Sequence, residues 1–518
     1  MRADQVVQRL KAWAAGRPLP AFSTIHCPIA PREDLLIVSF LRMGGESAPW
    51  AIGYGHQGRK PTVLTVPEAR NRNLVADMVA EFAPILLQHF GHPDFSDNSR
   101  YHAIDAWPLR QIWLPNSTHV DMLHFLAYSY TFTKWGSASR AKLLNAFGRL
   151  AGWLFRESGR PGEVSVMVAA EMLRSSYVFP AEDVRQAHLG FLLAWLNTTG
   201  GRDKRLRAAQ EAEQRSIATS LDPLIERDQL EPLVTRWNEA GARDNPRSGA
   251  REAAQIEKLL AVEIERRHNL VSQAIDVLKA DKRSTNPGCD VLAQAALEEH
   301  WYQYLRLEHR EDDADDGRAF APSPETDLNP RAAASRYFVQ EASDALRVGA
   351  LVHYDAKLQE EAVAMGEGIH GRLIDVRDDS STRATTPIWV LAIPDSGSLK
   401  VREGSWLCPV GIPKRTAIVR DVRRRGDKVE IELEVTGWKT AQSRAVPHAA
   451  DSRLKGKDMT LVPVSDESLS RKKSRKVWND DVAGAWLTHV RPAGHKARLD
   501  REVAEQNLGN VYVRGSRE

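Results

Sequence analysis

The stretch IVRDVRRRGDKVEIELEVTGWKT, residues 418–440, decides the fold of the C-terminal part of this chain. In its second half, apolar residues alternate with glutamates, which predicts a strand with one buried face and one carboxylate face. The apolar positions are Val429, Ile431, Leu433 and Val435. Gly426 and Asp427 predict a tight turn between this strand and the one before it, so the stretch is expected to form a β-hairpin.

Short apolar segments on the N-terminal side of the hairpin predict further strands. Glycine, proline and aspartate turns divide residues 368–438 into GIHGRLIDVRDD, TPIWVLAIP, LKVREGSWLCPVG, TAIVRDVRRR and KVEIELEVTGW. This spacing is typical of a small antiparallel β-barrel, which we assign to residues 367–446. Residues 447–518 are then a basic C-terminal tail.

The remainder of the chain predicts an α+β multidomain protein. Residues 34–66 read as an antiparallel meander of three strands, DLLIVSFLRM, PWAIGYG and PTVLTV, followed by an amphipathic helix. Farther along, helical periodicity dominates, including a helix expected from Pro180 to Asn197. The predicted domains are a small N-terminal sheet and helix unit (1–100), a large all-α domain (101–310), an acidic linker with a connecting helix (311–366), the barrel (367–446) and the tail (447–518).

Composition narrows the class of protein. The 518 residues include 71 basic and 68 acidic side chains, a net charge of +3, so any basic surface must be local. Cys27, Cys289 and Cys408 are far apart in sequence, which argues against a zinc ribbon or a disulfide scaffold and favours a cytoplasmic location. We find no apolar run of membrane-spanning length and no GxxxxGK[ST] motif, so neither membrane insertion nor a P-loop ATPase is expected.

The arginines of the hairpin allow two interpretations. In one, they pair with the glutamates of the neighbouring strand and form an ordinary charged surface, with only Arg425 and Lys428 projecting at the tip. In the other, they bind the phosphates of DNA or RNA. The tail adds RKKSRK beside Trp478, and basic clusters with adjacent aromatic residues can bind nucleic acid. The candidate nucleic-acid-binding residues are Arg423, Arg424, Arg425, Lys428, Lys472, Lys473, Arg475 and Lys476.

Other motifs fit catalysis or metal binding poorly, and we expect no cofactor and no metal. GYGHQG places Gly53, Gly55 and Gly58 in a GxGxxG pattern, but a strand follows instead of a helix, so a glycine-rich turn is expected. In HVDMLH, His119 and His124 are five positions apart, which on a helix points them in different directions. EDDADDG, residues 311–317, lacks the glycine and closing glutamate of a calcium loop.

Three phrases of the sequence carry a resemblance: LLNAFGRLAGWLFRES, FPAEDVRQAHLGFLLAWL and LKVREGSWLCPVG. In their general sequence pattern they resemble uncharacterised bacterial proteins that accompany helicases and nucleases in anti-phage defence operons. The resemblance implies a non-motor accessory subunit that recognises nucleic acid or a partner protein, with catalysis left to a separate helicase or nuclease. As the ligand we expect nucleic acid, DNA more than RNA. Two alternatives stay open: a metal-dependent nuclease or effector, with carboxylates and histidines drawn from AEDVRQAH and EEHWYQYLRLEHR, and a purely structural adaptor.

Overall fold

The computed structural model describes residues 3–44, 46–91, 109–159, 164–181, 185–243, 245–284, 349, 351–379, 386–395, 397–412, 415–437 and 451–463. These residues fall into two compact units. Unit 1 holds residues 3–21 and 25–284, and unit 2 holds residues 22–24 and the described residues from 349 onward. The domain boundaries that we predicted near residues 100, 310 and 446 lie outside the described residues.

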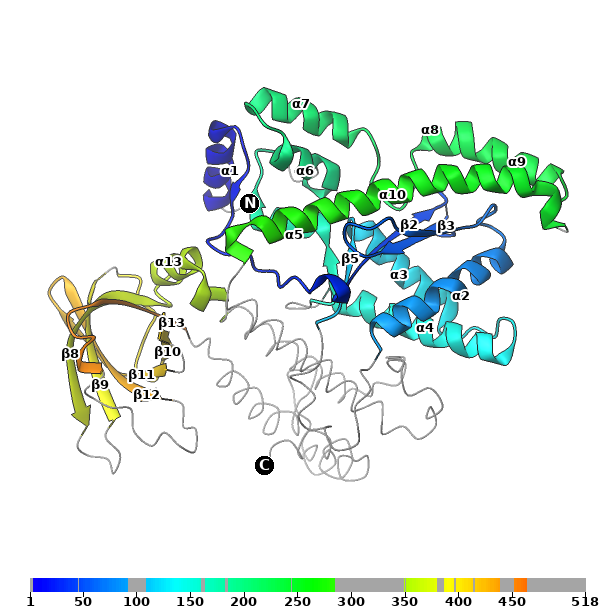
Figure 1. Cartoon of the computed structure of the whole chain (residues 1–518). Coiled ribbons are helices and arrows are strands. Elements are labelled where there is room, and N and C mark those ends of the chain that lie inside the picture. The colour runs from blue at the N-terminus through cyan, green and yellow to red at the C-terminus, as the bar shows by residue number, and fades with distance from the viewer. Residues whose placement is uncertain are drawn as a thin grey trace, which may run out of the picture. The chain divides into compact units, whose positions relative to one another are not determined.

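Unit 1 is built on a five-stranded sheet of order β4-β3-β2-β5-β6 (Figure 1). Strands β2 (Leu35–Arg42), β3 (Pro49–Gly55) and β4 (Thr62–Thr65) are antiparallel, which confirms the predicted meander. Strands β5 (Gln111–Leu114) and β6 (Val166–Val168) extend this sheet in parallel. The predicted N-terminal sheet and part of the predicted helical region therefore share one sheet.

Helices cover both faces of the sheet, and the part of unit 1 after residue 116 is mainly helical, as predicted. Among the described residues, no helix combines the length and apolar character needed to cross a membrane. The α-helices of unit 1 are α1 (Ala3–Ala15), α2 (Arg72–His89), α3 (Ser117–Tyr130), α4 (Ala138–Ser158), α5 (Ala169–Ser176), α6 (Leu189–Asn197), α7 (Arg202–Glu213), α8 (Pro223–Ile225), α9 (Glu231–Glu239) and α10 (Ala250–Ala280). The shorter elements are β1 (Leu19–Pro20) paired with β7 (Tyr177–Val178), the 3₁₀ helices η1 (Arg32–Asp34), η3 (Arg185–Ala187), η5 (Pro246–Gly249) and η6 (Lys282–Ser284), and the π-helix η4 (Glu226–Leu230).

Strand β2 divides the interior of unit 1 into two cores. Its residues Leu36, Val38 and Phe40 lie in the core that includes α2, α3 and α4. Leu35 and Ile37 point the other way, into the core that includes α5 and α6, and α10 contributes to both cores. A strand buried on both faces needs apolar residues at successive positions, which explains the nearly unbroken run LLIVSFL.

Unit 2 contains a closed antiparallel barrel of six strands, which confirms the predicted small β-barrel (Figure 1). The helix α13 (Ala356–Ala364) precedes the barrel. Its strands are β8 (Ile369–Asp379), β9 (Thr386–Pro394), β10 (Trp406–Pro409), β11 (Arg415–Arg425), β12 (Lys428–Gly437) and β13 (Asp458–Pro463), in the order β10-β11-β12-β9-β8-β13. Strand β13 pairs with both β8 and β10, so a segment that we assigned to the tail closes the barrel.

Candidate nucleic-acid interface

The basic hairpin of the sequence is the β11–β12 hairpin of the barrel. Its pairing has one irregularity, between Val419 and Asp421, and runs to Arg425 opposite Lys428, next to a two-residue turn. In this turn Gly426 has a φ of 63°, a left-handed conformation that favours glycine. The alternation that predicted β12 is confirmed, because Val429, Ile431 and Leu433 are fully buried in the barrel core. The intervening glutamates therefore lie on the outer surface.

The three consecutive arginines at the end of β11 all form ion pairs on this outer surface. The pairs are Arg423–Asp421 at 2.5 Å, Arg424–Asp395 at 3.5 Å and Arg425–Glu430 at 3.3 Å, each measured from Nε to a carboxylate oxygen. The predicted cross-strand pairing with glutamate thus occurs at Arg420, which contacts Glu434 at 2.9 Å. Arg425, which we expected to project at the tip, is also paired with a glutamate. Pairing with glutamate does not occur at Arg423 and Arg424, whose partners are aspartates.

The structure brings half of the predicted site residues together. Arg423, Arg424, Arg425 and Lys428 all lie at the turn end of the hairpin. The arginine side chains remain 57%, 63% and 64% exposed in spite of their ion pairs. Exposed guanidinium groups of this kind can exchange a carboxylate for a phosphate oxygen. The other predicted residues, Lys472, Lys473, Arg475 and Lys476, lie outside the described residues.

A buried ion pair joins β9, the start of β11 and the segment that precedes β13. Arg415, the first residue of β11, donates two parallel hydrogen bonds of 2.7 Å to the carboxylate of Asp451. Trp389 of β9 is fully buried and donates its indole N–H to the same carboxylate at 3.2 Å. Asp451 itself is 1% exposed, so its charge depends on these donors. This contact holds the barrel together and offers no free group to a ligand.

The GYGHQG motif runs from the end of β3 into the predicted glycine-rich turn, and it packs against α10. Strand β4 follows it, and a side chain at Gly53 would place its Cβ 2.1 Å from Ile264 on α10. The turn is also hydrogen-bonded to α10, since Gln57 donates to Asp276 at 2.6 Å and the N–H of Gly58 donates to Ser272 at 3.2 Å. The glycines allow close packing of strand and helix, which accounts for the pattern without a phosphate.

The histidines of HVDMLH serve separate structural roles. His119 is fully buried, whereas His124 stacks on Phe155 with ring centroids 4.5 Å apart. Within the described part of the chain, no group of three or more histidine, cysteine or acidic side chains is placed to hold a metal ion. The EDDADDG segment and residues 298–310 of the nuclease alternative lie outside the described residues, as do Glu182 and Asp183.

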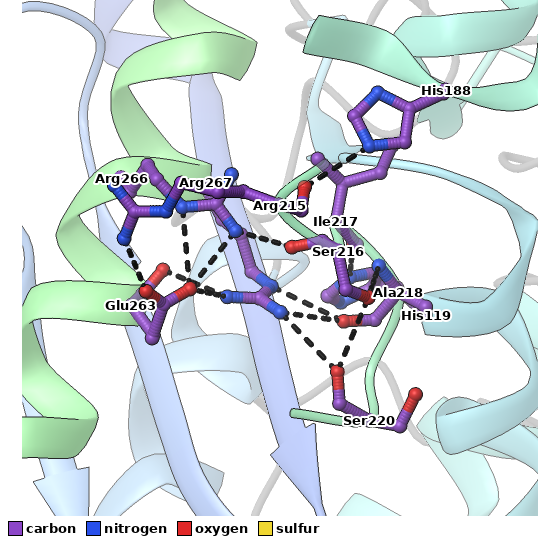
Figure 2. A network of polar contacts seen from close by, with 10 residues as sticks. All are labelled: His119, His188, Arg215, Ser216, Ile217, Ala218, Ser220, Glu263, Arg266 and Arg267. Carbon is purple, nitrogen blue, oxygen red and sulfur yellow. Dashed lines mark hydrogen bonds and ion pairs between the residues drawn. The ribbon is translucent and has the colours of Figure 1, made fainter. Parts of the chain in front are cut away.

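A buried polar network that the sequence did not indicate lies between α10 and the segment 215–220 (Figure 2). Glu263 of α10 accepts hydrogen bonds from Arg215 at 2.5 Å, from Arg266 at 2.9 Å and from Arg267 at 2.9 Å. Burial acts to raise the pKa of Glu263, but these three guanidinium groups outweigh it and hold the pKa below its usual value. The carboxylate is therefore charged at neutral pH.

Arg267 uses its whole guanidinium group inside the protein. It donates to Glu263 and to the backbone carbonyls of Ala218 and Ser220, and its side chain is 0% exposed (Figure 2). Burial lowers the pKa of Arg267 to about 10, which leaves it protonated at neutral pH. Because an arginine has five N–H donors and all five are used here, the group has no capacity left for a ligand. The network fixes the segment 215–220 against α10. Its one signal in the sequence is a Glu–Arg pair at i, i+4 on the apolar face of a helix.

Comparison with known proteins adds no function. We compared the chain with protein-family models, with curated proteins and with solved structures, and none of them matches it. The resemblance to proteins of defence operons therefore stays a prediction.

Proposed function

We propose that this protein binds nucleic acid through the turn end of the β11–β12 hairpin, as an accessory subunit that leaves catalysis to a separate helicase or nuclease. The observation that carries the proposal is the run Arg423, Arg424 and Arg425, whose side chains are all more than half exposed at one edge of the barrel. Guanidinium groups can bind phosphate oxygens through two parallel hydrogen bonds, so a row of three suits a phosphodiester backbone.

The ion pairs of these arginines are compatible with the proposal. Ion pairs between exposed side chains stabilise a protein by about 0–1 kcal/mol, so exchanging the carboxylate for a phosphate costs little. The separations of 3.5 Å for Arg424 and 3.3 Å for Arg425 are longer than those of strong charge-assisted hydrogen bonds. The same carboxylates lower the local positive potential, and binding is therefore expected to be modest in affinity and sensitive to salt.

The test is binding of labelled single- and double-stranded DNA and RNA across a salt series, with the full-length protein. Replacing Arg423, Arg424 and Arg425 by alanine is expected to weaken binding to all sequences alike. The slope of log affinity against log salt should fall by about one for each arginine that contacts a phosphate. The double variant Asp395→Asn/Glu430→Gln should bind more tightly than the natural protein, because it frees two of the arginines from their carboxylates.

A matched control removes the same charge elsewhere on unit 2. Lys400, Arg402 and Lys455 are exposed side chains of this unit, and their triple alanine variant should keep most of the affinity and the salt slope. If both triple variants weaken binding equally, the protein attracts nucleic acid only through its net charge and the hairpin assignment fails. If neither variant changes binding, the proposal is wrong.

The same assay separates the two alternative functions. Cleavage of the labelled strand that requires magnesium would favour the metal-dependent nuclease. The absence of any binding at physiological salt, together with co-purification of a second protein, would favour the structural adaptor.

A further inference from the structure

A hollow lined by cations lies in unit 1, where α3 ends and α4 begins. Its volume is 420 Å³, and the charged side chains that line it are Lys134, Lys142 and Arg149, with no carboxylate among the lining residues. The residues Thr133 and Asn145 add polar groups to the wall. Lys134 and Lys142 are exposed, and two neighbouring cations with no acid among the lining residues give the hollow a positive potential that attracts an anion.

The fold builds this hollow from two helices held unusually close. Lys142, Asn145 and Arg149 are spaced i, i+3 and i+7 on α4, so they share one face of the helix. At Gly148 an added Cβ would lie 2.4 Å from the backbone nitrogen of Thr131, which means that the end of α3 rests directly on α4. This contact brings Thr133 and Lys134, just beyond α3, to the cationic face of α4.

The wall of the hollow has hydrogen-bonding capacity that the protein does not use. Oδ1 of Asn145 is shielded from solvent and accepts no hydrogen bond. Buried polar atoms of side chains are normally paired with protein or with ordered water. The oxygen of Asn145 can only accept a hydrogen bond, so it suits a donor such as an N–H group of a base and not a phosphate oxygen.

Two exposed aromatic residues are close in sequence to the part of the hollow that follows α3. Tyr128 is 87% exposed and Phe132 is 68% exposed, the two highest values among the large apolar side chains of the described residues. Tyr128 is in the last turn of α3, whereas Phe132 follows the end of that helix and directly precedes Thr133 of the hollow. Rings of this kind form platforms on which the bases of a single strand stack, while nearby cations bind its phosphates.

We infer that this face of unit 1, defined by Tyr128, Phe132, Lys134, Lys142 and Arg149, binds single-stranded nucleic acid. The phosphates lie in the cationic hollow and two bases stack on the aromatic rings. A duplex cannot use the rings, because its bases are already stacked and paired inside the helix. The inference rests on the proposed function for the class of ligand, and it adds a second site in a different unit together with the form of the nucleic acid.

The experiment measures binding of a fluorescein-labelled oligothymidylate of 20 nucleotides, and of a duplex of equal length, to the full-length protein. The variant Tyr128→Ala/Phe132→Ala should lose affinity for the oligothymidylate by about 10- to 100-fold, with an unchanged salt slope and unchanged duplex binding. The variant Lys134→Ala/Lys142→Ala should lower the salt slope for the single strand by about 0.7 for each lysine that contacts a phosphate.

Controls make each outcome decisive. Lys204 and Arg207 are exposed cations of α7 in the same unit, and their double alanine variant should bind the oligothymidylate like the natural protein. Thymidine monophosphate should displace the strand only at far higher concentration than unlabelled oligothymidylate. The inference is overturned if the aromatic variant binds the strand normally, if it loses duplex binding to the same extent, or if the mononucleotide competes as well as the strand. Loss of binding with the hairpin variant alone would overturn the inference and leave the proposed function standing.

Discussion

At the scale of single residues, His119 illustrates how burial determines protonation in this protein. Its Nδ1 accepts a hydrogen bond from the N–H of Phe40 at 3.0 Å, and its Nε2 lies 3.1 Å from the carbonyl oxygen of Ile217. A carbonyl can only accept, so the proton of the neutral ring is on Nε2. Burial, assisted by the nearby charge of Arg267, lowers the pKa of His119 to about 3.

This residue predicts a pH-dependent stability for unit 1. The pKa of His119 in the folded state is below that of an unfolded chain, about 6.5. The unfolded state therefore takes up a proton first as the pH falls. The contribution of His119 to the free energy of unfolding is fully present above pH 6.5 and is lost progressively toward pH 3. We expect the natural protein to lose about 1.4 kcal/mol of its free energy of unfolding per pH unit in this window through His119 alone.

The variant His119→Gln isolates that contribution, because glutamine keeps a donor and an acceptor but does not titrate. The free energy of unfolding of both proteins is measured in urea at pH 7.5, 6, 5 and 4.5. The difference in free energy of unfolding between the natural protein and the variant should become smaller as the pH falls. A difference that stays constant over this range would show that His119 does not resist protonation.

The sequence predicted some of these residue roles and missed others. It predicted that the two histidines of HVDMLH point in different directions, and they have different neighbours: His119 is hydrogen-bonded to Phe40 and Ile217, and His124 stacks on Phe155. It placed the start of a helix at Pro180, whereas α6 begins at Leu189 and its cap is His188, whose Nδ1 accepts from the N–H of Phe191. That prediction is wrong because proline and acidic residues are common cap signals, and a histidine cap depends on the second contact of its ring, here with the carbonyl of Arg215.

At the scale of elements, the packing of α3 on α4 depends on a glycine. A Cβ at Gly148 would lie 2.4 Å from the nitrogen of Thr131 and 2.7 Å from the carbonyl carbon of Tyr130. Both are backbone atoms, so a larger residue has to move one helix. Gly148→Ala is expected to lower the free energy of unfolding by about 1–3 kcal/mol, measured by urea unfolding followed by circular dichroism.

Gly152 provides a control on the same helix. A Cβ there would lie 3.3 Å from the Cβ of Ala127, a contact that a shift of the backbone by a few tenths of an ångström can relieve. Gly152→Ala should change the free energy of unfolding by less than about 1 kcal/mol, because the gain in helix propensity offsets the closer contact. Equal effects of the two substitutions would contradict the role assigned to Gly148.

The elements that the sequence predicted well are those with clear periodicity or long apolar runs. The meander of β2, β3 and β4 and the alternating strand β12 are of this kind. Strands β5 and β6 were missed. They are only four and three residues long, all buried, and have no alternation that would distinguish them from the surrounding helices.

At the scale of the whole molecule, the two units have separate cores, and the barrel has its own buried ion pair. Asp451→Asn leaves Arg415 without a counter-charge, and breaking a buried pair in this way destabilises a protein by about 3–5 kcal/mol. We expect faster hydrogen exchange in β9, β10, β11 and β13 and unchanged exchange in α10, measured by mass spectrometry. Asp375→Asn, which removes a carboxylate paired with Lys455 at the surface, should leave both regions unchanged. Faster exchange throughout the chain would contradict separate stabilisation of the barrel.

The extent of the barrel and its charge pairing could be predicted only in part. Adjacent segments predicted five strands, but β13 follows a long connection and has polar residues before it, so its sequence resembled a tail. The sequence also predicted Glu430 as a partner of the hairpin arginines, because it is on the adjacent strand of the hairpin, but it did not predict Asp395. Asp395 follows β9, which pairs with β12, and only the order of strands in the barrel brings it to Arg424.

The position of β13 in the chain has a consequence for biosynthesis. Strands β8 to β12 leave the ribosome first, and until residues 458–463 follow, both β8 and β10 have an unpaired edge. Unpaired strand edges readily pair with other chains and lead to aggregation. Translation that stops before Asp458 is therefore expected to yield an aggregation-prone nascent protein, and protection by a chaperone is needed most in the interval before the last strand is made.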